Sequence, residues 1–555
     1  MSEISNQVLS DSFRESKNFF ESDLMLSDFF NRTASLEAKV YFSESLNKTG
    51  RIAAKEMDEL SMLADKNGPT LVKRNRFGET IDEIKFHPSY WDLMQIAIDS
   101  QMFSVKWKPD LRQKFEQESH LLGFSAGYLY ALSEMGQFCP LCMTDGVARL
   151  IDRFCEPDDK ARLLPKIYTD SLEGFATGAM FLTEKSGGSD VGRNIVQATK
   201  VEGNQYVLNG EKWFCSNANA QIIFALARTN PSISGTKGLS IFLVEPILPN
   251  GERNSIEFVR LKDKLGVRSM ASAECIFKNA KATLVGEEFQ GFKIMTEMIN
   301  LSRIYNAVAA VACSRRAMVE AYQFLTFRIS FGKNAIDHAL IQKKINELTA
   351  LQTAGFYMTM HCINQLDKAD NGDDKAGALL RLLTPMTKKW TAEKGVYIVR
   401  ESMELMGGMG YIEDGIMPKL MRDMMVLPIW EGAGNVMTLD MLRAAMKSNG
   451  LAEMVSFIDS KVINDTELRD KWLDFKIEIE ELFQLQNQNV MEWKAEDVFH
   501  LLTDFMQVAV LKRNLNDENK AFVQPSIDFF KSKILGEKRK TITKEIIVGQ
   551  VAWNF

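Results

Sequence analysis

The sequence of 555 residues lacks any uninterrupted apolar run of 18 or more residues, the length that a helix needs to cross a membrane. It also lacks a secretory signal pattern, because its first residues, MSEISNQVLSDSFRESKNFFESD, mix acids and hydroxyls without an apolar stretch. Cysteine is scarce: seven residues, an odd number scattered along the chain, suit reduced thiols better than a disulfide framework. These absences predict a soluble, cytoplasmic protein with no membrane span.

Basic charge is also in short supply. Lys and Arg number 67 against 73 Asp and Glu, and a net charge of -6 has the wrong sign for a protein that grips phosphate backbones. The five histidines are dispersed, and the pair Cys139 and Cys142 has no second ligand pair at zinc-like spacing. We therefore expect no metal centre and regard nucleic acid as a disfavoured partner.

Proline is rare, with 13 residues, and no low-complexity tract suggests disorder, so the whole chain is expected to fold. The length exceeds the roughly 250 to 300 residues at which one hydrophobic core stops growing. The pattern is mostly helical from about 10 to 175, with strand-like runs and turns from about 176 to 290. In that second segment, NQYVLNGEKWFCS predicts two strands joined at Asn209-Gly210, a strong hairpin signal.

Long helical patterns return after residue 290, at roughly 291–330, 336–366, 376–406 and 430–446, with a break at Asn371-Gly372. Four long helices in sequence predict a bundle. Residues from about 450 onward are helical again. The expected architecture is thus mainly α with a central β-domain: a helical domain (1–175), a β-barrel or sandwich (176–290), a four-helix bundle (291–446) and a helical extension (447–555).

The segment TEKSGGSDV, residues 183–191, lies where the helical pattern gives way to strands. Its glycines expose backbone N–H groups beside a hydroxyl, which suits a phosphate, but a solvated Gly/Ser turn explains the same letters. It is neither a Walker loop nor a Gly-x-Gly-x-x-Gly turn between a strand and a helix, so a Rossmann nicotinamide enzyme is disfavoured.

A second segment, PIWEGAGN at residues 428–435, places Glu431 between a Trp and two glycines, ahead of a helix. A carboxylate desolvated by an indole becomes a better base for a weak carbon acid, because desolvation raises its pKa. An acid favoured by a helix start is the other interpretation. The segment alone does not decide between them.

Five segments occur in the order and spacing of the acyl-CoA dehydrogenase family, which the chain therefore resembles: TEKSGGSDV, KWFCSN, RISFGK, MELMGGMGY and IWEGAGN. The resemblance extends to the AidB-like branch through FHPSYWDLMQ, RLKDKLGVRSMAS and the extension after residue 446. It implies a helical domain, a β-domain and a four-helix bundle, assembled as a homotetramer with FAD at a subunit interface.

The resemblance also implies which residues contact FAD. The TEKSGGSDV segment contacts the flavin and the thioester end of the substrate, Phe214 forms an aromatic wall, and Ser216 places a hydroxyl near flavin N5. Strand alternation puts residues 214 and 216 on one face. Arg328 and Phe331 are implied to hold the pyrophosphate and adenine of a neighbouring subunit's FAD. The complete implied cofactor set is Met180, Leu182, Thr183, Gly188, Ser189, Phe214, Ser216, Arg328, Phe331, Gly407, Gly408, Ala433 and Asn435.

The resemblance gives the base two family positions: the one that Glu431 occupies, and one on an earlier helix just before a family arginine that matches Arg303. Ser302 stands at the second position and cannot serve, so Glu431 is the candidate base. It is implied to remove the α-proton of an acyl thioester while flavin N5 accepts a hydride from the β-carbon. Ser189 and Arg303 are the candidate substrate contacts.

Two other functions remain open. AidB-like proteins are associated with DNA and alkylation response, but residues 451–555 hold 14 basic and 18 acidic side chains, so DNA is disfavoured unless a patch such as Arg443 with residues 538–540 binds it. A weakly active flavoprotein that binds fatty acyl chains is the other. An acyl-CoA substrate and an electron-transfer flavoprotein or another acceptor are the expected partners of the dehydrogenase.

Overall fold

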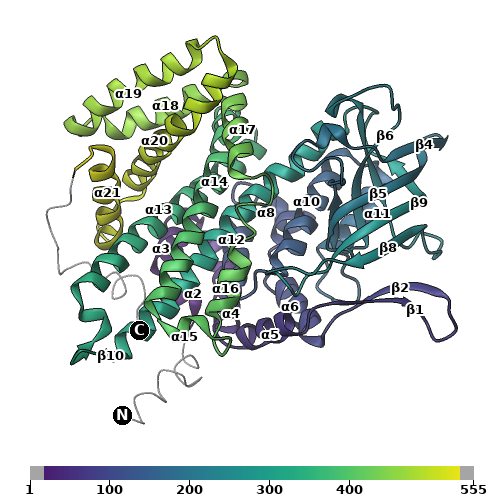
Figure 1. Cartoon of the computed structure of the whole chain (residues 1–555), viewed down its shortest axis with the longest axis horizontal. Coiled ribbons are helices and arrows are strands. Elements are labelled where there is room, and N and C mark those ends of the chain that lie inside the picture. The colour runs from purple at the N-terminus through teal and green to yellow at the C-terminus, as the bar shows by residue number, and fades with distance from the viewer. Residues whose placement is uncertain (1–17, 538–555) are drawn as a thin grey trace. The chain divides into compact units, whose positions relative to one another are not determined.

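The computed structural model describes residues 18–537, and these residues form two compact units that do not follow chain order. The β-unit consists of Met57–Lys114 and Glu134–Tyr305, and the bundle unit contains the other described residues. The helix α12, Gly291–Phe327, contributes to both units (Figure 1). The basic cluster at 538–540 lies outside the described residues.

Seven strands of the β-unit form a single sheet that closes on itself. Its order is β3-β6-β4-β5-β9-β7, β7 pairs again with β6, and β8 pairs with β9. The strands are β3 (Gly178–Phe181), β4 (Gln197–Glu202), β5 (Gln205–Ser216), β6 (Ile222–Arg228), β7 (Leu239–Val244), β8 (Ile256–Leu261) and β9 (Ser272–Leu284). Closure removes free sheet edges from the five strands of the ring. The predicted central barrel is confirmed.

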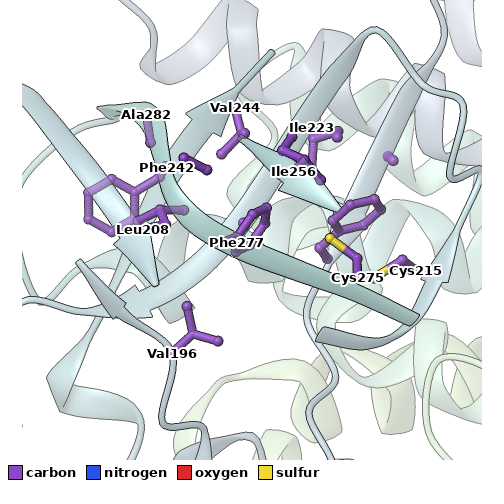
Figure 2. Close-up of a cluster of buried hydrophobic side chains, with 14 of the residues drawn as sticks. Val196, Leu208, Cys215, Ile223, Phe242, Val244, Ile256, Cys275, Phe277 and Ala282 are labelled. Carbon is purple, nitrogen blue, oxygen red and sulfur yellow. The ribbon is translucent and has the colours of Figure 1, made fainter. Parts of the chain in front are cut away.

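The interior of the barrel is filled by side chains that alternate along its strands. Figure 2 shows Leu208, Phe242 and Phe277, from β5, β7 and β9, among this buried cluster. Cys215 and Cys275 also lie in the cluster, and burial raises the pKa of the Cys215 thiol well above its usual value. A thiol in such surroundings is unreactive. These buried side chains hold the inner face of β5 against the barrel core.

The predicted hairpin at Asn209-Gly210 is wrong, because both residues lie inside the continuous strand β5. The pairing of β5 with β9 shifts register between Leu208 and Asn209, and Gly210 has φ of 137°. A Cβ at Gly210 would come within 2.8 Å of Val196, so the glycine permits close strand packing at a bulge. The turn before β5 is instead formed at Gly203, with φ of 54°.

The β-unit also contains helices, of which α10 packs on β3 and β6 of the barrel. One hairpin interrupts the helical segment that the sequence predicts. The helices are α5 (Glu56–Lys66), α6 (Pro88–Asp99), α7 (Ser104–Trp107), α8 (Pro109–Lys114), α10 (Phe138–Phe154) and α11 (Pro157–Ile167). The unpredicted strands β1 (Thr70–Arg74) and β2 (Thr80–Lys85) pair in antiparallel fashion. Asn75 accepts backbone N–H bonds from Phe77 and Glu79, which makes it the turn-forming residue.

Long helices build the bundle unit. They include α4 (Leu36–Ala54), α9 (Ser119–Ala131), α13 (Ala339–Asp370), α14 (Asp374–Leu405) and α17 (Gly434–Lys447), with shorter α2 (Phe19–Ser22), α3 (Leu24–Thr33), α15 (Gly408–Tyr411) and α16 (Met417–Met424). The predicted break at Asn371-Gly372 is confirmed, with Gly372 at φ of 89° and the Asp373 side chain capping α14. The four predicted long helices correspond to α12, α13, α14 and α17.

Up to residue 537, the extension forms four further helices: α18 (Gly450–Val462), α19 (Thr466–Gln484), α20 (Gln488–Asn514) and α21 (Lys520–Ile534). Asp465 and Asn487 accept backbone N–H bonds at the starts of α19 and α20. α20 and α21 pack on α13, so the extension is part of the bundle unit and not a separate body (Figure 1). The predicted helical extension is confirmed over its described residues.

The sequence predicts no membrane span and no disulfide framework. Throughout residues 18–537, we find no helix with the length and apolar character that crossing a bilayer requires. The seven cysteines all lie in this range and form no disulfide.

Candidate functional site

Strand β3 and the loop after it carry five of the predicted cofactor contacts. On β3, Met180 is half-buried whereas its neighbours Ala179 and Phe181 are buried in the barrel, so its side chain lies on the outer side. Leu182 and Thr183 are half-buried, and Gly188 and Ser189 are exposed. A Cβ added at Gly188 would meet no atom within 4 Å. The loop therefore offers exposed backbone and a hydroxyl next to open space, as a phosphate or flavin edge requires.

A buried ion pair fixes this loop. Glu184 and Lys212 are 2.7 Å apart, and their side chains are 2% and 0% exposed. The Glu184 carboxylate also accepts the backbone N–H groups of Ile195 and Val196. Burial lowers the pKa of Lys212, and the Coulombic attraction of Glu184 opposes this shift. A carboxylate satisfied from three sides joins the start of the loop, its end and strand β5.

Strand β5 presents the predicted flavin wall beside this loop. The Trp213 N–H donates to the Thr183 carbonyl over 2.9 Å, which joins strand and loop directly. Phe214 is 55% exposed, Cys215 is completely buried and Ser216 is half-buried. The expected alternation along β5 is therefore confirmed. A large aromatic ring left half-exposed next to a hydroxyl is a surface on which a flat ring system can stack.

The connection from β8 to β9 lies against the same part of β5. The Lys262 ammonium is 3.2 Å from the centroid of the Trp213 ring and 4.9 Å from that of Phe214. The Ser272 hydroxyl lies 3.4 Å from the Ser216 hydroxyl, and Lys264 Nζ lies 3.4 Å from Ser272 Oγ. Two lysines of one segment thus contact the side chains that surround the predicted flavin face.

Arg303 also belongs to the β-unit, on α12. It is 8% exposed, and its Nη1 donates to Asn300 Oδ1 over 3.2 Å. The preceding Ser302 is 2% exposed and donates its hydroxyl proton to the Ile299 carbonyl within the helix. Ser302 is therefore a structural residue in the helix interior, and no carboxylate stands at that position.

In the bundle unit, a two-strand hairpin after α12 carries Arg328 and Phe331. Its strands are β10 (Ile329–Ser330) and β11 (Lys333–Asn334), joined by Phe331 at φ of 50° and Gly332 at φ of 83°. Arg328 is exposed, and Phe331 is 98% exposed. A phenylalanine held at a hairpin tip with almost no cover gains nothing by burial in its own chain. The tip is suited to contact another molecule.

Gly407 precedes α15, and Gly408 is the first residue of that helix. Gly407 has φ of 59°, and a Cβ at either position would meet no atom within 4 Å. The nearby Glu404, which is exposed, accepts from Arg400 over 2.7 Å. The two glycines allow a ligand to approach the backbone closely.

Glu431 lies in the turn before α17 and has φ of 59°, a left-handed conformation that is uncommon for a residue other than glycine. Lys388 on α14 is 1% exposed, and its ammonium donates to the Gly432 carbonyl over 2.6 Å and to the Pro428 carbonyl over 3.4 Å. Ala433 and Asn435 follow, the latter exposed in the first turn of α17. A buried lysine therefore fixes an acid in a strained backbone, a feature that concentrates at functional sites.

The predicted residues divide between the two units. The β-unit holds Met180, Leu182, Thr183, Gly188, Ser189, Phe214, Ser216 and Arg303, and the bundle unit holds Arg328, Phe331, Gly407, Gly408, Glu431, Ala433 and Asn435. Sequence reasoning missed the supporting residues Lys212, Glu184, Lys264, Ser272 and Lys388. Glu184 lies within TEKSGGSDV and Lys212 within KWFCSN, so their place in matched segments was the signal that could have revealed this pair.

Comparisons with known families cover most of the chain. Residues 7–173 match the adaptive response protein AidB N-terminal domain, 179–280 the acyl-CoA dehydrogenase middle domain and 290–446 the acyl-CoA dehydrogenase C-terminal domain. AidB of Escherichia coli (strain K12) is 33% identical over 454 residues, which are 79% of this chain and 81% of that protein. Acyl-CoA dehydrogenase family member 11 of Caenorhabditis elegans is 29% identical, covering 77% of this chain and 70% of that protein.

Solved structures show the same fold. Caenorhabditis elegans ACDH-11, in complex with C11-CoA, has a TM-score of 0.85 at 24% identity and covers 97% of this chain and 95% of that one. A Bacillus anthracis acyl-CoA dehydrogenase complexed with FAD has a TM-score of 0.71 at 19% identity, with 97% and 90% covered. Taken with the family matches and the E. coli relative, these findings establish that the chain belongs to the acyl-CoA dehydrogenase family, in its AidB-like branch, and is an FAD-dependent oxidoreductase.

Proposed function

We propose that the protein oxidises an acyl-CoA thioester between its α and β carbons, with Glu431 as the base that removes the α-proton. The observation that carries this proposal is the strained backbone of Glu431, with φ of 59°, fixed by the buried Lys388. A conformation that costs free energy persists where the surrounding structure imposes it, and such positions cluster at active sites. An acid that only favoured a helix start would need no such conformation.

The β-unit residues fit the isoalloxazine end of FAD. Phe214 supplies the half-exposed wall and Ser216 the adjacent hydroxyl. Met180 and the loop from Leu182 to Ser189, which includes Thr183, supply groups at the edge of the ring. Bound FAD accepts two electrons as a hydride, which is the redox chemistry that the protein itself lacks. The role of these residues is to position the ring and exclude water from one of its faces.

The bundle-unit residues fit the other parts of the cofactor. Gly407 and Gly408 allow close backbone approach, and Arg328 offers a planar guanidinium that donates to two phosphate oxygens at once. The residues proposed here for FAD are Arg328, Phe331, Gly407, Gly408, Ala433 and Asn435. Because Arg328 and Phe331 are exposed in their own chain, we propose that they contact the FAD of a second copy in a homotetramer.

The substrate proposal is an acyl-CoA of undefined chain length. The Caenorhabditis elegans ACDH-11 structure contains C11-CoA, which supports a fatty acyl thioester as the class. Ser189 and Arg303 are the proposed substrate contacts, one exposed on the cofactor loop and one largely buried on α12. Electrons would leave through an electron-transfer flavoprotein or another acceptor. Seven thiols without a disulfide suit a reducing compartment, so we propose that the protein acts in the cytoplasm. The proposed acyl-CoA substrate would give it a role in fatty acid metabolism.

Within residues 18–537, no observation favours a DNA-binding role. Lysines of the extension are engaged in ion pairs: Lys512 and Lys531 lie 3.1 and 2.9 Å from Asp465, and Lys533 lies 2.8 Å from Asp504. Arg443 is exposed on α17, but one arginine is too little charge to retain a duplex at physiological salt.

The decisive experiment follows the visible absorbance of FAD-loaded protein mixed anaerobically with saturated acyl-CoAs of increasing length. We expect at least one of them to bleach the wild type, and Glu431→Gln to retain FAD without bleaching. Glu413→Gln is the matched control, because Glu413 is an exposed acid of the same unit. Bleaching of Glu431→Gln at the wild-type rate would refute the base assignment, and absence of bleaching at every chain length would refute the dehydrogenase proposal.

A further inference from the structure

Two hydroxyls and an ammonium lie in a row beside the outer face of β5. Ser216 on β5 pairs in register with Ser272 on β9, and their hydroxyl oxygens are 3.4 Å apart. Lys264 Nζ is 3.4 Å from Ser272 Oγ and also donates to the Met270 carbonyl. The Lys262 N–H donates to the Ser272 carbonyl over 2.7 Å, which holds the segment carrying Lys264 against β9. All of these residues belong to the β-unit.

The chemistry of lysine gives this row a direction. An ammonium has three protons to donate and no lone pair, so Ser272 Oγ must accept from Lys264. The Ser272 proton is then available to Ser216 Oγ, and the Ser216 proton is left to be donated to another acceptor. Ser272 is 4% exposed, so bulk water does not compete freely for its hydroxyl. A hydroxyl that could donate or accept is thereby biased toward donation.

We propose that Lys264 and Ser272 are positioning residues that fix Ser216 as a hydrogen-bond donor to flavin N5. This rests on the proposed function, which places Ser216 at N5. Oxidised flavin carries a lone pair at N5 and accepts a hydrogen bond, whereas the reduced ring carries N5–H and donates one. A donor fixed by Lys264 and Ser272 therefore favours oxidised FAD over reduced FAD, and keeps the resting cofactor in the form that receives substrate electrons.

The contact lengths set the size of the effect. Both contacts are 3.4 Å, at the long end for hydrogen bonds, so each is weak and the row acts through direction more than through strength. We expect removal of either residue to weaken the binding of oxidised FAD about threefold to fivefold and to leave the binding of reduced FAD nearly unchanged. Fivefold corresponds to a rise of about 20 mV in the two-electron potential.

The test measures FAD affinity and reduction potential, neither of which requires turnover. The single variants are Ser272→Ala, Lys264→Met and Ser216→Ala. The double variants combine Ser216→Ala with Ser272→Ala and with Lys264→Met. In the wild-type background, we expect Ser272→Ala and Lys264→Met to raise the reduction potential. When Ser216 is already alanine, we expect either change to alter the equilibrium ratio of reduced to oxidised FAD less than twofold. Such non-additivity identifies residues that act through Ser216.

Controls separate this role from a structural one. Ser272→Thr and Lys264→Arg retain the hydroxyl and the donors, and we expect both to behave like wild type. Lys281→Met removes an exposed lysine of β9, 3.8 Å from Glu252, and should move neither readout. Ser272→Ala leaves the contact of Lys264 with the Met270 carbonyl in place, so it remains decisive if Lys264→Met does not fold.

Three outcomes overturn the inference. Equal shifts from Ser272→Ala with and without Ser216 would show that the row does not act through Ser216. A shift from Ser216→Ala alone, with none from Ser272→Ala or Lys264→Met, would refute the row and leave the placement of Ser216 at N5 intact. If Ser216→Ala changes neither affinity nor potential, the placement at N5 fails and the row fails with it.

Discussion

The two groups of site residues are held in different ways. In the β-unit, the cofactor loop is joined to β5 by Glu184 and Lys212, a fully buried ion pair whose carboxylate also accepts two backbone N–H groups. In the bundle unit, the buried ammonium of Lys388 donates to two carbonyl oxygens of the turn that carries Glu431. The first arrangement satisfies a charge. The second holds a strained backbone.

We propose that this difference corresponds to different tasks. A flat cofactor needs a support that does not move, and a barrel face with a closed hydrogen-bond ladder provides one. A base needs its carboxylate at a defined point, even where the backbone conformation is unfavourable, and a packed lysine can impose that conformation. We therefore expect damage to the β-unit pair to cost mainly stability and FAD, and damage to the Lys388 contacts to cost mainly rate.

The largest effect is expected from Lys212→Met, which leaves the buried Glu184 carboxylate without its counter-charge. Breaking one partner of a buried pair costs about 3 to 5 kcal/mol. Denaturant unfolding should show this loss, and FAD affinity should fall with it because the cofactor loop loses its attachment. In the exposed pair of Lys185 with Glu211, Lys185→Met should cost less than about 1 kcal/mol. Similar losses from the two variants would contradict the distinction between buried and surface pairs.

Lys388→Met should have the next largest effect. It leaves the Gly432 and Pro428 carbonyls without their donor, at a cost of about 1 to 3 kcal/mol, and displacement of the base by about 1 Å can slow the chemical step up to about 100-fold. Rapid mixing of the variant with substrate measures flavin reduction, while FAD content should stay normal. Lys375→Met, an exposed lysine on the same helix, is the control. A variant that loses FAD but reduces it at the normal rate would reverse the comparison.

The sequence predicted the large features well because they depend on local patterns. The long helices and the break at Asn371-Gly372 follow from periodicity and capping, and the exposed side of Phe214 and Ser216 follows from strand alternation. The hairpin prediction at Asn209-Gly210 failed because the same two residues suit both a tight turn and a bulge with close packing. The close approach of Val196 to Gly210, which favours the bulge, is a tertiary contact.

The supporting residues were harder to predict, for a physical reason. Lys388 is one of two adjacent lysines in α14, and nothing in the neighbouring sequence indicates that Lys388 is only 1% exposed. Its contacts with Pro428 and Gly432 join residues 40 and 44 positions apart. The sequence pattern indicated the acid at Glu431, but nothing in the local residues indicated its φ of 59°.

A pH measurement sharpens the comparison within the bundle unit. Burial lowers the pKa of His361 to about 3, and Arg513 and Lys368 add to the shift. The ring stacks on Phe457 at 4.9 Å. Since the unfolded pKa is 6.5, the unfolded state binds the extra proton, so stability is full above pH 6.5 and falls by up to about 1.4 kcal/mol per pH unit toward pH 3. His361→Phe should flatten this slope by one proton in denaturant unfolding at several pH values; an unchanged slope would contradict the buried neutral form.

The smallest expected effect tests the strain at Glu431 directly. Because its φ of 59° suits glycine and penalises any side chain, Glu431→Gly should be more stable than Glu431→Ala by about 1 kcal/mol, although neither variant can abstract a proton. At Glu478, an exposed position within helix α19, the order should reverse, because glycine costs a helix about 1 kcal/mol relative to alanine. If alanine is favoured at both positions, the turn is not strained and Lys388 only supports it. If the order reverses as expected, the protein gives up folding stability to place its proposed base, a cost that the Glu184–Lys212 pair does not carry.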